Sequence, residues 1–216
     1  MPLTFYFAPY STASVTEEVL AELGTPHERI ELAIGAGGTR TPEFLAINPN
    51  GRVPTIVHDG AVIWESAAIT LYLGETFGVE QGLYPASGPR RGEAMKWIVW
   101  TNMVLAEAGG RLSAQMDGDG AAQEESPDYV SPEMRSETAA ARARADVAAS
   151  LAILQAALTG QSFLLGDYSL ADTHTQCFVG WLTMLGTDLS PYPQVEAWLA
   201  RCMARPALAA LAELQN

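Results

Sequence analysis

The sequence predicts a two-domain protein in which a small mixed α/β domain precedes an all-helical domain. Strand and helix patterns alternate over residues 3 to 77, and only helical patterns follow residue 88. A cluster of helix and strand breakers lies between them, as is typical of a linker: Gly78, Gly82, Pro85, Gly88 and Pro89. The domains are therefore assigned to residues 1–80 and 88–216.

The chain begins with a strand–helix–strand unit. Residues 3 to 7, LTFYF, form a short apolar run typical of a buried strand. After the loop APYST, apolar residues recur at the spacing of one helix face until Gly24 ends the helix. The segment from His27 to Leu32 alternates weakly as a second strand. A unit of this length predicts two parallel strands joined by a right-handed crossover.

Residues 41 to 77 add a helix, a hairpin and a further helix. Thr41 before Pro42 predicts an N-cap followed by proline at the first helical position, and NPNG ends this short helix. The segments VPTIVH and AVIW are separated by Asp59-Gly60, a dipeptide that suits a type I′ hairpin turn. A helix from Ser66 to about Phe77 completes the order β-α-β-α-β-β-α of a thioredoxin-like domain.

The second domain is predicted to be helical throughout, over residues 89–115, 132–158, 170–185 and 193–213. An acidic stretch, DGDGAAQEESPDY, separates the first two of these helices. It lacks the ligand spacing and the terminal Glu of an EF-hand. We therefore interpret it as a solvated loop and not as a calcium site.

Charge and composition limit the partners. The chain carries 25 acidic and 12 basic residues, a net charge of -13 that repels nucleic acid. No apolar window approaches the roughly 18 residues of a membrane helix, and the start MPLTFYF lacks a signal peptide's charged region. We expect a cytoplasmic protein without a membrane partner. Cys177 and Cys202, far from any C-x-x-C or His cluster, are interpreted as reduced core thiols, and no metal site is expected.

Two features of the first domain each have a structural and a functional interpretation. Val53-Pro54 opens a strand, where it is either an ordinary extended trans pair or part of a binding edge. Ser66 suits a plain helix N-cap, but the N–H groups of such a helix start also accept a carboxylate. Glu65 beside it suits an ammonium group. Together, Glu65 and Ser66 fit an amino-acid head group.

The third feature is the hydroxyl-rich loop from Tyr10 to Ser14. Its hydroxyls suit helix caps, and Ser14 with Glu17 fits a capping box. Alternatively, one hydroxyl and the helix dipole stabilise a thiolate placed above the helix N-terminus. No serine hydrolase signature surrounds this loop, so a serine nucleophile is not expected.

These motifs resemble those of cytosolic glutathione transferases over essentially the whole chain. NPNGRVPTI followed by WESAAITLYL resembles the family's signature around its cis-proline and its Glu/Asp-Ser pair. YSLADTH resembles the capping box of the family's sixth helix, with Ser169 at the N-cap and Asp172 at N3. Thr173 replaces the usual apolar residue, which implies a weaker hydrophobic staple. The tail PYPQVEAWLARCMARPAL resembles the family's final helices.

The resemblance implies roles for individual residues in glutathione binding. Pro54 would be cis and would present the backbone of Val53 to the cysteinyl unit. Glu65 and Ser66 would hold the γ-glutamyl end. Two arginines are candidates for the glycyl carboxylate, Arg52 first and Arg40 second.

The residue that activates the thiol is left open by the resemblance. Ser11 matches the serine of many bacterial members, Thr12 falls at the cysteine of the beta class, and Tyr6 roughly matches the tyrosine of vertebrate-type classes. Cysteine is absent from the loop, which argues against mixed-disulfide chemistry. We rank Ser11 first, then Tyr10 or Thr12, and expect Tyr6 to serve in packing.

The resulting prediction is a homodimeric glutathione transferase that activates its co-substrate glutathione as a thiolate for conjugation to small apolar electrophiles in detoxification. The electrophile site would draw on the helix that carries Met103, Leu105 and Arg111. One alternative is a specialised glutathione-dependent isomerase, dehalogenase or peroxidase on the same fold. Another is a non-catalytic binding or scaffold protein.

Overall fold

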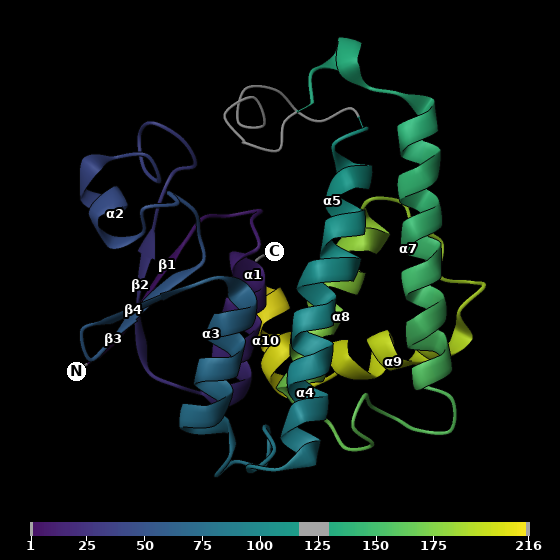
Figure 1. The fold of residues 1–216 in the computed structure, drawn as a ribbon. Helices are drawn as coiled ribbons and strands as arrows, with labels where there is room; N and C mark the ends of the chain where they lie inside the picture. Colours follow the sequence, from purple (N-terminus) through teal and green to yellow (C-terminus); the bar gives the residue numbers. More distant parts are fainter. Residues whose placement is uncertain (1, 117–129, 215–216) are drawn as a thin grey trace.

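The computed structural model describes residues 2–116 and 130–214 (Figure 1). The acidic stretch between the first two predicted helices of the second domain lies outside the described residues. The first seven elements follow the predicted order: β1 (Leu3–Phe7), α1 (Ala13–Leu23), β2 (His27–Glu31), α2 (Pro42–Ile47), β3 (Thr55–His58), β4 (Ala61–Trp64) and α3 (Ser66–Leu73).

The four strands form one mixed sheet in the order β2-β1-β3-β4. β1 and β2 are parallel, as the strand–helix–strand unit predicts, and the two other pairs are antiparallel. Helices α1 and α3 cover the face turned toward the second half of the chain, and α2 covers the other face (Figure 1). Successive side chains of β1 point to opposite faces of the sheet. Phe5 is fully buried, and the Tyr6 ring on the other face packs on Phe44 of α2 with ring centroids 5.6 Å apart.

Local turn and cap chemistry explains several boundaries. Asp59 and Gly60 have φ angles of 51° and 81°, which confirms the two-residue type I′ turn. Thr41 caps α2 by accepting a hydrogen bond from the Phe44 N–H, with Pro42 in the first turn. The predicted capping box of Ser14 and Glu17 is wrong. The Ser14 hydroxyl donates instead to the Ser11 carbonyl, because α1 begins at Ala13, two residues before the start that an N-cap at Ser14 would give.

The second half is helical where it is described. The π-helical segment η1 (Gly74–Gly78) extends α3. The predicted helix 89–115 is a continuous rod of α4 (Pro89–Trp100), the π-helical segment η2 (Thr101–Ala106) and α5 (Glu107–Ser113). The remaining elements are η3 (Pro132–Met134), a short 3-10 turn, then α7 (Glu137–Ala157), α8 (Leu170–Met184), α9 (Pro193–Met203) and α10 (Pro206–Leu214).

The prediction of a single helix over residues 193–213 is wrong. The helix is interrupted between Met203 and Pro206, because a proline disfavours the helical conformation of the residue before it. The break also lets Arg205 reach back to α1, where its guanidinium donates two hydrogen bonds of 2.7 Å to the carboxylate of Glu22. The split therefore ties the end of the chain to the first domain.

Helix α8 is the centre of the second half. Its first residues confirm the predicted capping box: Asp172 accepts from the Ser169 N–H at 3.0 Å. The same carboxylate accepts from the Leu164 N–H at 2.8 Å and from the Trp198 indole at 2.9 Å. Burial of Asp172 raises its pKa. One carboxylate thus joins α8, its preceding loop and α9.

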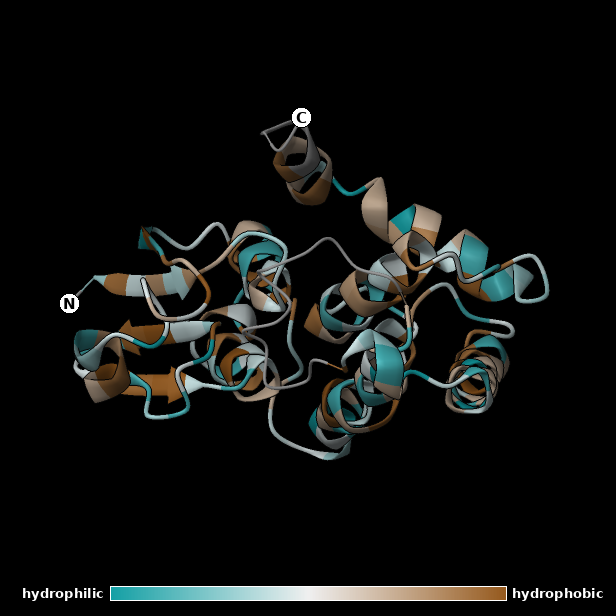
Figure 2. Cartoon of the chain, turned by 90° about the horizontal axis from the view of Figure 1, so that it is seen from above, coloured by the Kyte–Doolittle hydropathy of each residue, from teal (hydrophilic) through white to brown (hydrophobic). Residues whose placement is uncertain are grey.

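The core continues from the sheet into the helical half. The side chains of Phe5, Ile69, Ile98, Leu105 and Trp198 are completely buried within one apolar cluster. Hydrophilic and hydrophobic residues both occur along the helices, as amphipathic packing requires (Figure 2). In the part of the chain that is described, no helix is long and apolar enough to cross a membrane. The assignment of domains to residues 1–80 and 88–216 stays a prediction.

Candidate functional site

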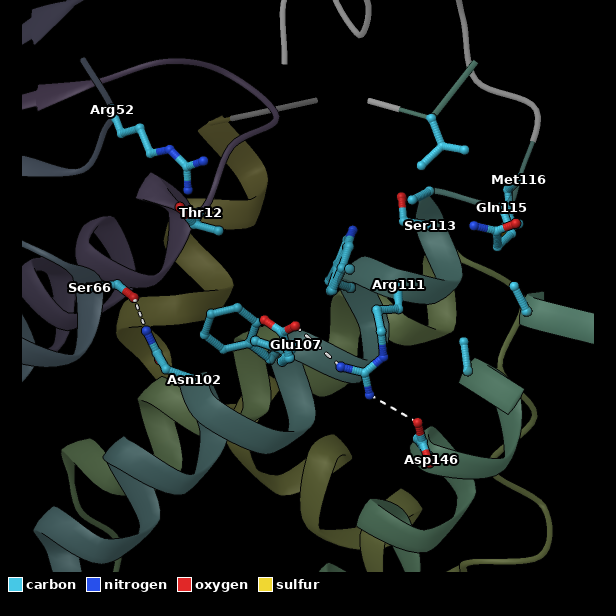
Figure 3. Close-up of a pocket in the computed structure, with 18 of the residues that line it drawn as sticks. Thr12, Arg52, Ser66, Asn102, Glu107, Arg111, Ser113, Gln115, Met116 and Asp146 are labelled. Carbon is cyan, nitrogen blue, oxygen red and sulfur yellow. Dashed lines mark hydrogen bonds and ion pairs between the residues drawn. The ribbon is translucent and has the colours of Figure 1, made fainter. Parts of the chain in front are cut away.

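A cavity of about 1140 Å³ separates the first domain from the helices α5 and α7. The loop before α1, the segment before β3 and the start of α3 form one wall. The rod η2–α5, helix α7 and part of α8 form the other. In Figure 3, Thr12, Arg52 and Ser66 lie on one side, and Arg111 and Asp146 lie opposite. The cavity therefore brings the predicted glutathione residues of the first domain to face the helical half.

The segment before β3 provides an extended edge to the cavity. The Val53–Pro54 peptide is cis, and both residues line the cavity. Buried Asn48 holds this segment, because its amide donates to the Arg52 carbonyl at 2.7 Å and to the hydroxyl of Thr55 at 3.0 Å. Arg52 itself is exposed and lines the same wall.

Glu65 and Ser66 lie side by side where β4 passes into α3. Glu65 has a φ of 72°, a conformation rare for residues with a side chain, and its exposed side chain lines the cavity. Ser66 is buried and also lines the cavity. The interpretation of Ser66 as an N-cap is wrong, because Ser66 is the first residue of α3 and Glu65 occupies the cap position.

A chain of hydrogen bonds fixes the Ser66 hydroxyl. Its Oγ accepts from Nδ2 of Asn102 at 2.9 Å, and Oδ1 of Asn102 lies 2.7 Å from Nε2 of His174. A carboxamide oxygen only accepts, so His174 carries its proton on Nε2, and its Nδ1 accepts from the Thr70 hydroxyl at 2.9 Å. Burial lowers the pKa of His174 to about 3, which keeps the ring neutral. Ser66 thus accepts a hydrogen bond from Asn102, and its own hydroxyl proton remains available to another acceptor.

Of the described loop residues from Tyr10 to Ser14, Thr12 alone lines the cavity. Its hydroxyl donates to the Val53 carbonyl at 3.3 Å. Ser11, ranked first from the sequence, uses its hydroxyl locally: it donates to the Ala8 carbonyl at 2.7 Å and accepts from the Ala13 N–H at 3.2 Å. Tyr10 is fully exposed, with a φ of 56°.

Two further predicted residues lie outside the cavity. The Arg40 guanidinium donates to the Asn50 carbonyl at 3.1 Å. Met103 is 70% exposed on η2, although its neighbour Asn102 lines the cavity. Leu105 is buried in the core, whereas Arg111 lines the cavity. Successive residues of a helix point in different directions, so Met103, Leu105 and Arg111 of this rod face different surroundings. The sequence pattern alone did not distinguish them.

The facing surfaces of α5 and α7 complete the cavity. Each contributes residues at the spacing i, i+3, i+4 and i+7, which places them on one helix face. The salt bridges of Arg111 with Glu107 (3.2 Å) and with Asp146 (3.0 Å) connect the two helices (Figure 3). Sequence analysis missed Asn102, Arg142 and Asp146. On these faces the cavity is lined by Glu107, Gly110 and Arg111 of α5 with Ala114 at its C-cap, and by Ala139, Arg142, Ala143 and Asp146 of α7; Ser113 at the end of α5 also lines it.

The cysteines lie outside the cavity. Burial and the nearby Glu18 raise the pKa of the Cys177 thiol, and burial raises that of Cys202. Neither group is therefore an activated thiol. Among residues 2–116 and 130–214, no group of three or more His, Cys, Asp or Glu side chains is arranged to hold a metal ion.

Comparisons with known proteins agree with this geometry. Residues 1–75 match the family model described as Glutathione S-transferase, N-terminal domain, and residues 119–206 match Glutathione S-transferase, C-terminal domain. Glutathione S-transferase GstB of Escherichia coli K12 is 31% identical over 192 residues, covering 88% of this chain and 86% of that protein. Disulfide-bond oxidoreductase YfcG of the same organism is 29% identical over 214 residues, covering 95% and 92%.

Solved structures share the whole fold. A theta class glutathione S-transferase from Xanthomonas axonopodis pv. citri, with glutathione bound, is 27% identical with a TM-score of 0.82, covering 97% of each chain. The glutathione transferase URE2P6 from Phanerochaete chrysosporium, in complex with oxidized glutathione, has a TM-score of 0.86 at 23% identity, covering 99% of this chain and 96% of that one. Together with the cis-proline edge, these matches show that the chain belongs to the glutathione S-transferase family.

Proposed function

We propose that this protein binds glutathione along the cis-proline edge and activates its thiol for attack on a small electrophile. The observation that carries the proposal is the assembly of Thr12, Val53, Pro54, Glu65 and Ser66 on one wall of a single large cavity. The facing helical wall leaves space for a second substrate beside the thiol. Glutathione serves as co-substrate, and no metal is required.

The first wall provides complementary partners for each part of glutathione. The backbone of Val53 pairs with the cysteinyl unit. Glu65 accepts from the ammonium group, and Ser66 donates to the γ-glutamyl carboxylate, for which the chain through Asn102 leaves its proton available. Arg52 binds the glycyl carboxylate, and Arg40 is the second candidate for it.

Thr12 replaces Ser11 as the proposed activating residue. Thr12 lines the cavity, and a rotation about its Cα–Cβ bond redirects the hydrogen bond that its hydroxyl donates from the Val53 carbonyl to a thiolate. Lowering the pKa of a thiol by two units from about 8.5 requires about 2.7 kcal/mol. One hydrogen bond to a charged sulfur contributes about 1.5 to 3 kcal/mol, and the N-terminus of α1 adds some tenths. A single hydroxyl is therefore sufficient.

Assembly and cellular role remain proposals that follow from the family. Apolar side chains are exposed on the sheet-edge strand β4, at Val62 and Trp64, and on the rod α4–η2, at Val99, Met103 and Val104. Exposed apolar surface at a sheet edge favours a homodimer over a monomer. We likewise propose a cytoplasmic detoxification enzyme without a membrane or nucleic-acid partner.

Disulfide reduction is a second candidate function, which the similarity to Disulfide-bond oxidoreductase YfcG favours. The thiolate of bound glutathione would attack a substrate disulfide, and a second glutathione would release the first as oxidised glutathione. Cys177 and Cys202 do not take part, because both lie outside the cavity. Comparing the turnover of a small disulfide with that of an alkyl halide distinguishes the two functions, because disulfide reduction predicts faster turnover of the disulfide and conjugation predicts faster turnover of the halide.

Calorimetric titration of glutathione into the wild-type protein and a Glu65→Gln variant tests the binding proposal. The substitution removes the charge that faces the ammonium group, and we expect the Kd to rise about tenfold. Glu75→Gln, which changes a carboxylate paired with Arg91 outside the cavity, is the control and should leave the Kd unchanged. Equal affinities of the wild type and Glu65→Gln would place the ligand elsewhere.

A further inference from the structure

We propose that the helical side of the cavity binds the carboxylate of an anionic electrophile, with Arg142 as its principal partner. This inference rests on the proposed function and narrows its substrate class from apolar electrophiles to aromatic or other partly apolar carboxylates. It arises from the distribution of charge around the cavity.

The described lining of the cavity is richer in basic side chains than the chain as a whole. Among the described residues that line it, four are arginines and three are Asp or Glu, whereas the full sequence has 12 Lys and Arg residues and 25 Asp and Glu residues. The chain as a whole has a net charge of -13, so this concentration of arginine contrasts with the composition of the molecule. An arginine in such a lining that is not neutralised by a carboxylate attracts an anionic ligand.

Among the arginines of the helical wall, the local partners differ. Arg111 lies between the carboxylates of Glu107 and Asp146, which neutralise it. The Arg135 side chain donates to the Val130 carbonyl at 3.3 Å. Arg142 has neither a hydrogen-bond nor an ion-pair partner within the described part of the chain. Its guanidinium therefore remains available to a ligand carboxylate, which it can bind through two parallel hydrogen bonds.

The surroundings of Arg142 define the rest of the ligand. Ala139 and Ala143 share its face of α7, and Gly110 on α5 also lines the cavity, so small side chains leave space beside the guanidinium. Phe178 and Trp181 of α8 contribute an aromatic surface. An electrophile with an aromatic ring and a carboxylate satisfies both features.

A benzylic halide illustrates the reaction. The thiolate of glutathione attacks the benzylic carbon of 4-(bromomethyl)benzoate and forms a carbon–sulfur bond. The carbon–bromine bond breaks, bromide leaves with the bonding electron pair, and the proton released earlier from the thiol goes to solvent. The carboxylate is unchanged in this step and serves only in binding.

Two conjugates that differ in one group test the proposal without requiring turnover. S-(4-carboxybenzyl)glutathione carries the carboxylate, and S-(4-carbamoylbenzyl)glutathione is its neutral counterpart. Calorimetry should show that the wild type binds the acid about tenfold more tightly than the amide. In Arg142→Gln this ratio should fall to about one. Arg144→Gln is the matched control, since Arg144 lies on another face of α7 paired with Glu137, and it should retain the ratio.

The outcomes separate the two proposals. Equal affinity of the wild type for both conjugates, or a ratio that Arg142→Gln leaves unchanged, overturns the anionic-substrate inference while glutathione binding stands. Failure to bind either conjugate or glutathione itself overturns the proposed function and, with it, the inference. As a second variant, Arg142→Glu should favour the amide conjugate, and retained preference for the acid would also contradict the proposal.

Discussion

At the scale of single residues, hydrogen-bond geometry decides between candidates that sequence similarity leaves equivalent. Ser11 and Thr12 are neighbours with similar chemistry. The structure directs Ser11 into the turn that begins α1 and directs Thr12 toward the cavity. Tyr10, which precedes them, has a positive φ of 56°, and a loop conformation of that kind has no periodic sequence signal. Glu65 and Ser66, which adjoin a predictable helix start, could be located from sequence.

Asn102 is a residue that only the structure reveals, because its partners Ser66 and His174 are distant in sequence. If Asn102 acts by orienting the Ser66 hydroxyl, Asn102→Ala should raise the Kd for glutathione about fivefold, the loss of roughly one hydrogen bond. In a Ser66→Ala background the same substitution should have almost no effect, since the contact is already lost.

Calorimetric titrations of the wild type, the two single variants and the double variant provide the measurement. Thermal unfolding of each variant shows whether the fold is retained. Additive losses from the two substitutions would mean that Asn102 and Ser66 act independently, and the positioning role of Asn102 would be discarded.

At the scale of elements, boundaries marked by an explicit turn or capping signal were predictable, and a boundary crossed by a continuing apolar pattern was not. The Asp59-Gly60 turn and the Thr41 cap follow from two or three adjacent residues. The break before Pro206 was missed, although the proline itself was the available signal, because apolar periodicity continues across it. The arrangement of α7 against α5, which creates the helical wall, depends on long-range packing.

The hydrogen bonds that the Asp172 carboxylate accepts at the start of α8 should contribute strongly to the stability of the protein. Asp172→Ala leaves the buried donors of Leu164, Ser169 and Trp198 without their acceptor. We expect the free energy of unfolding to fall by about 3 to 5 kcal/mol in urea denaturation. Asp167→Ala removes the exposed ion pair with Arg90 and should cost less than about 1 kcal/mol. Comparable losses in the two variants would contradict this account.

At the scale of the whole molecule, two titratable groups, one in α1 and one in α8, change the stability with pH in opposite directions. At the interface of α1 and α8, burial, with a smaller contribution from Glu17 and Glu22, raises the pKa of Glu18 to about 8. The Gln176 amide donates to this carboxylate. His174, also in α8, has its pKa lowered to about 3. Near neutral pH, α1 and α8 therefore carry Glu18 and His174, respectively, in their neutral forms.

The sign of each effect follows from proton binding. Between pH 4.5 and about 8, folded Glu18 holds a proton that the unfolded chain has released, so stability falls as pH rises. Between about 3 and 6.5, the unfolded chain binds a proton that folded His174 does not, so stability rises with pH. From pH 6.5 to 8 only the first effect remains, and it amounts to about 2 kcal/mol at about 1.4 kcal/mol per pH unit.

Glu18→Gln should abolish that decline in the free energy of unfolding between pH 6.5 and 8, measured by urea denaturation at both values. Glu28→Gln, on the exposed side of β2, is the control and should decline like the wild type. A decline of equal size in Glu18→Gln would show that another group titrates in this range.

The central claim of the account is that the protein activates the thiol of bound glutathione through the hydroxyl of Thr12. The most direct measurement is the ultraviolet absorbance of the thiolate as a function of pH, in complexes of glutathione with the wild type, Thr12→Val and Ser11→Ala. The account predicts a thiol pKa about two units below the free value of about 8.5 in the wild type and in Ser11→Ala. It predicts a pKa near the free value in Thr12→Val. A bound thiol that titrates like free glutathione in the wild type, or a Thr12→Val complex identical to it, would contradict the account.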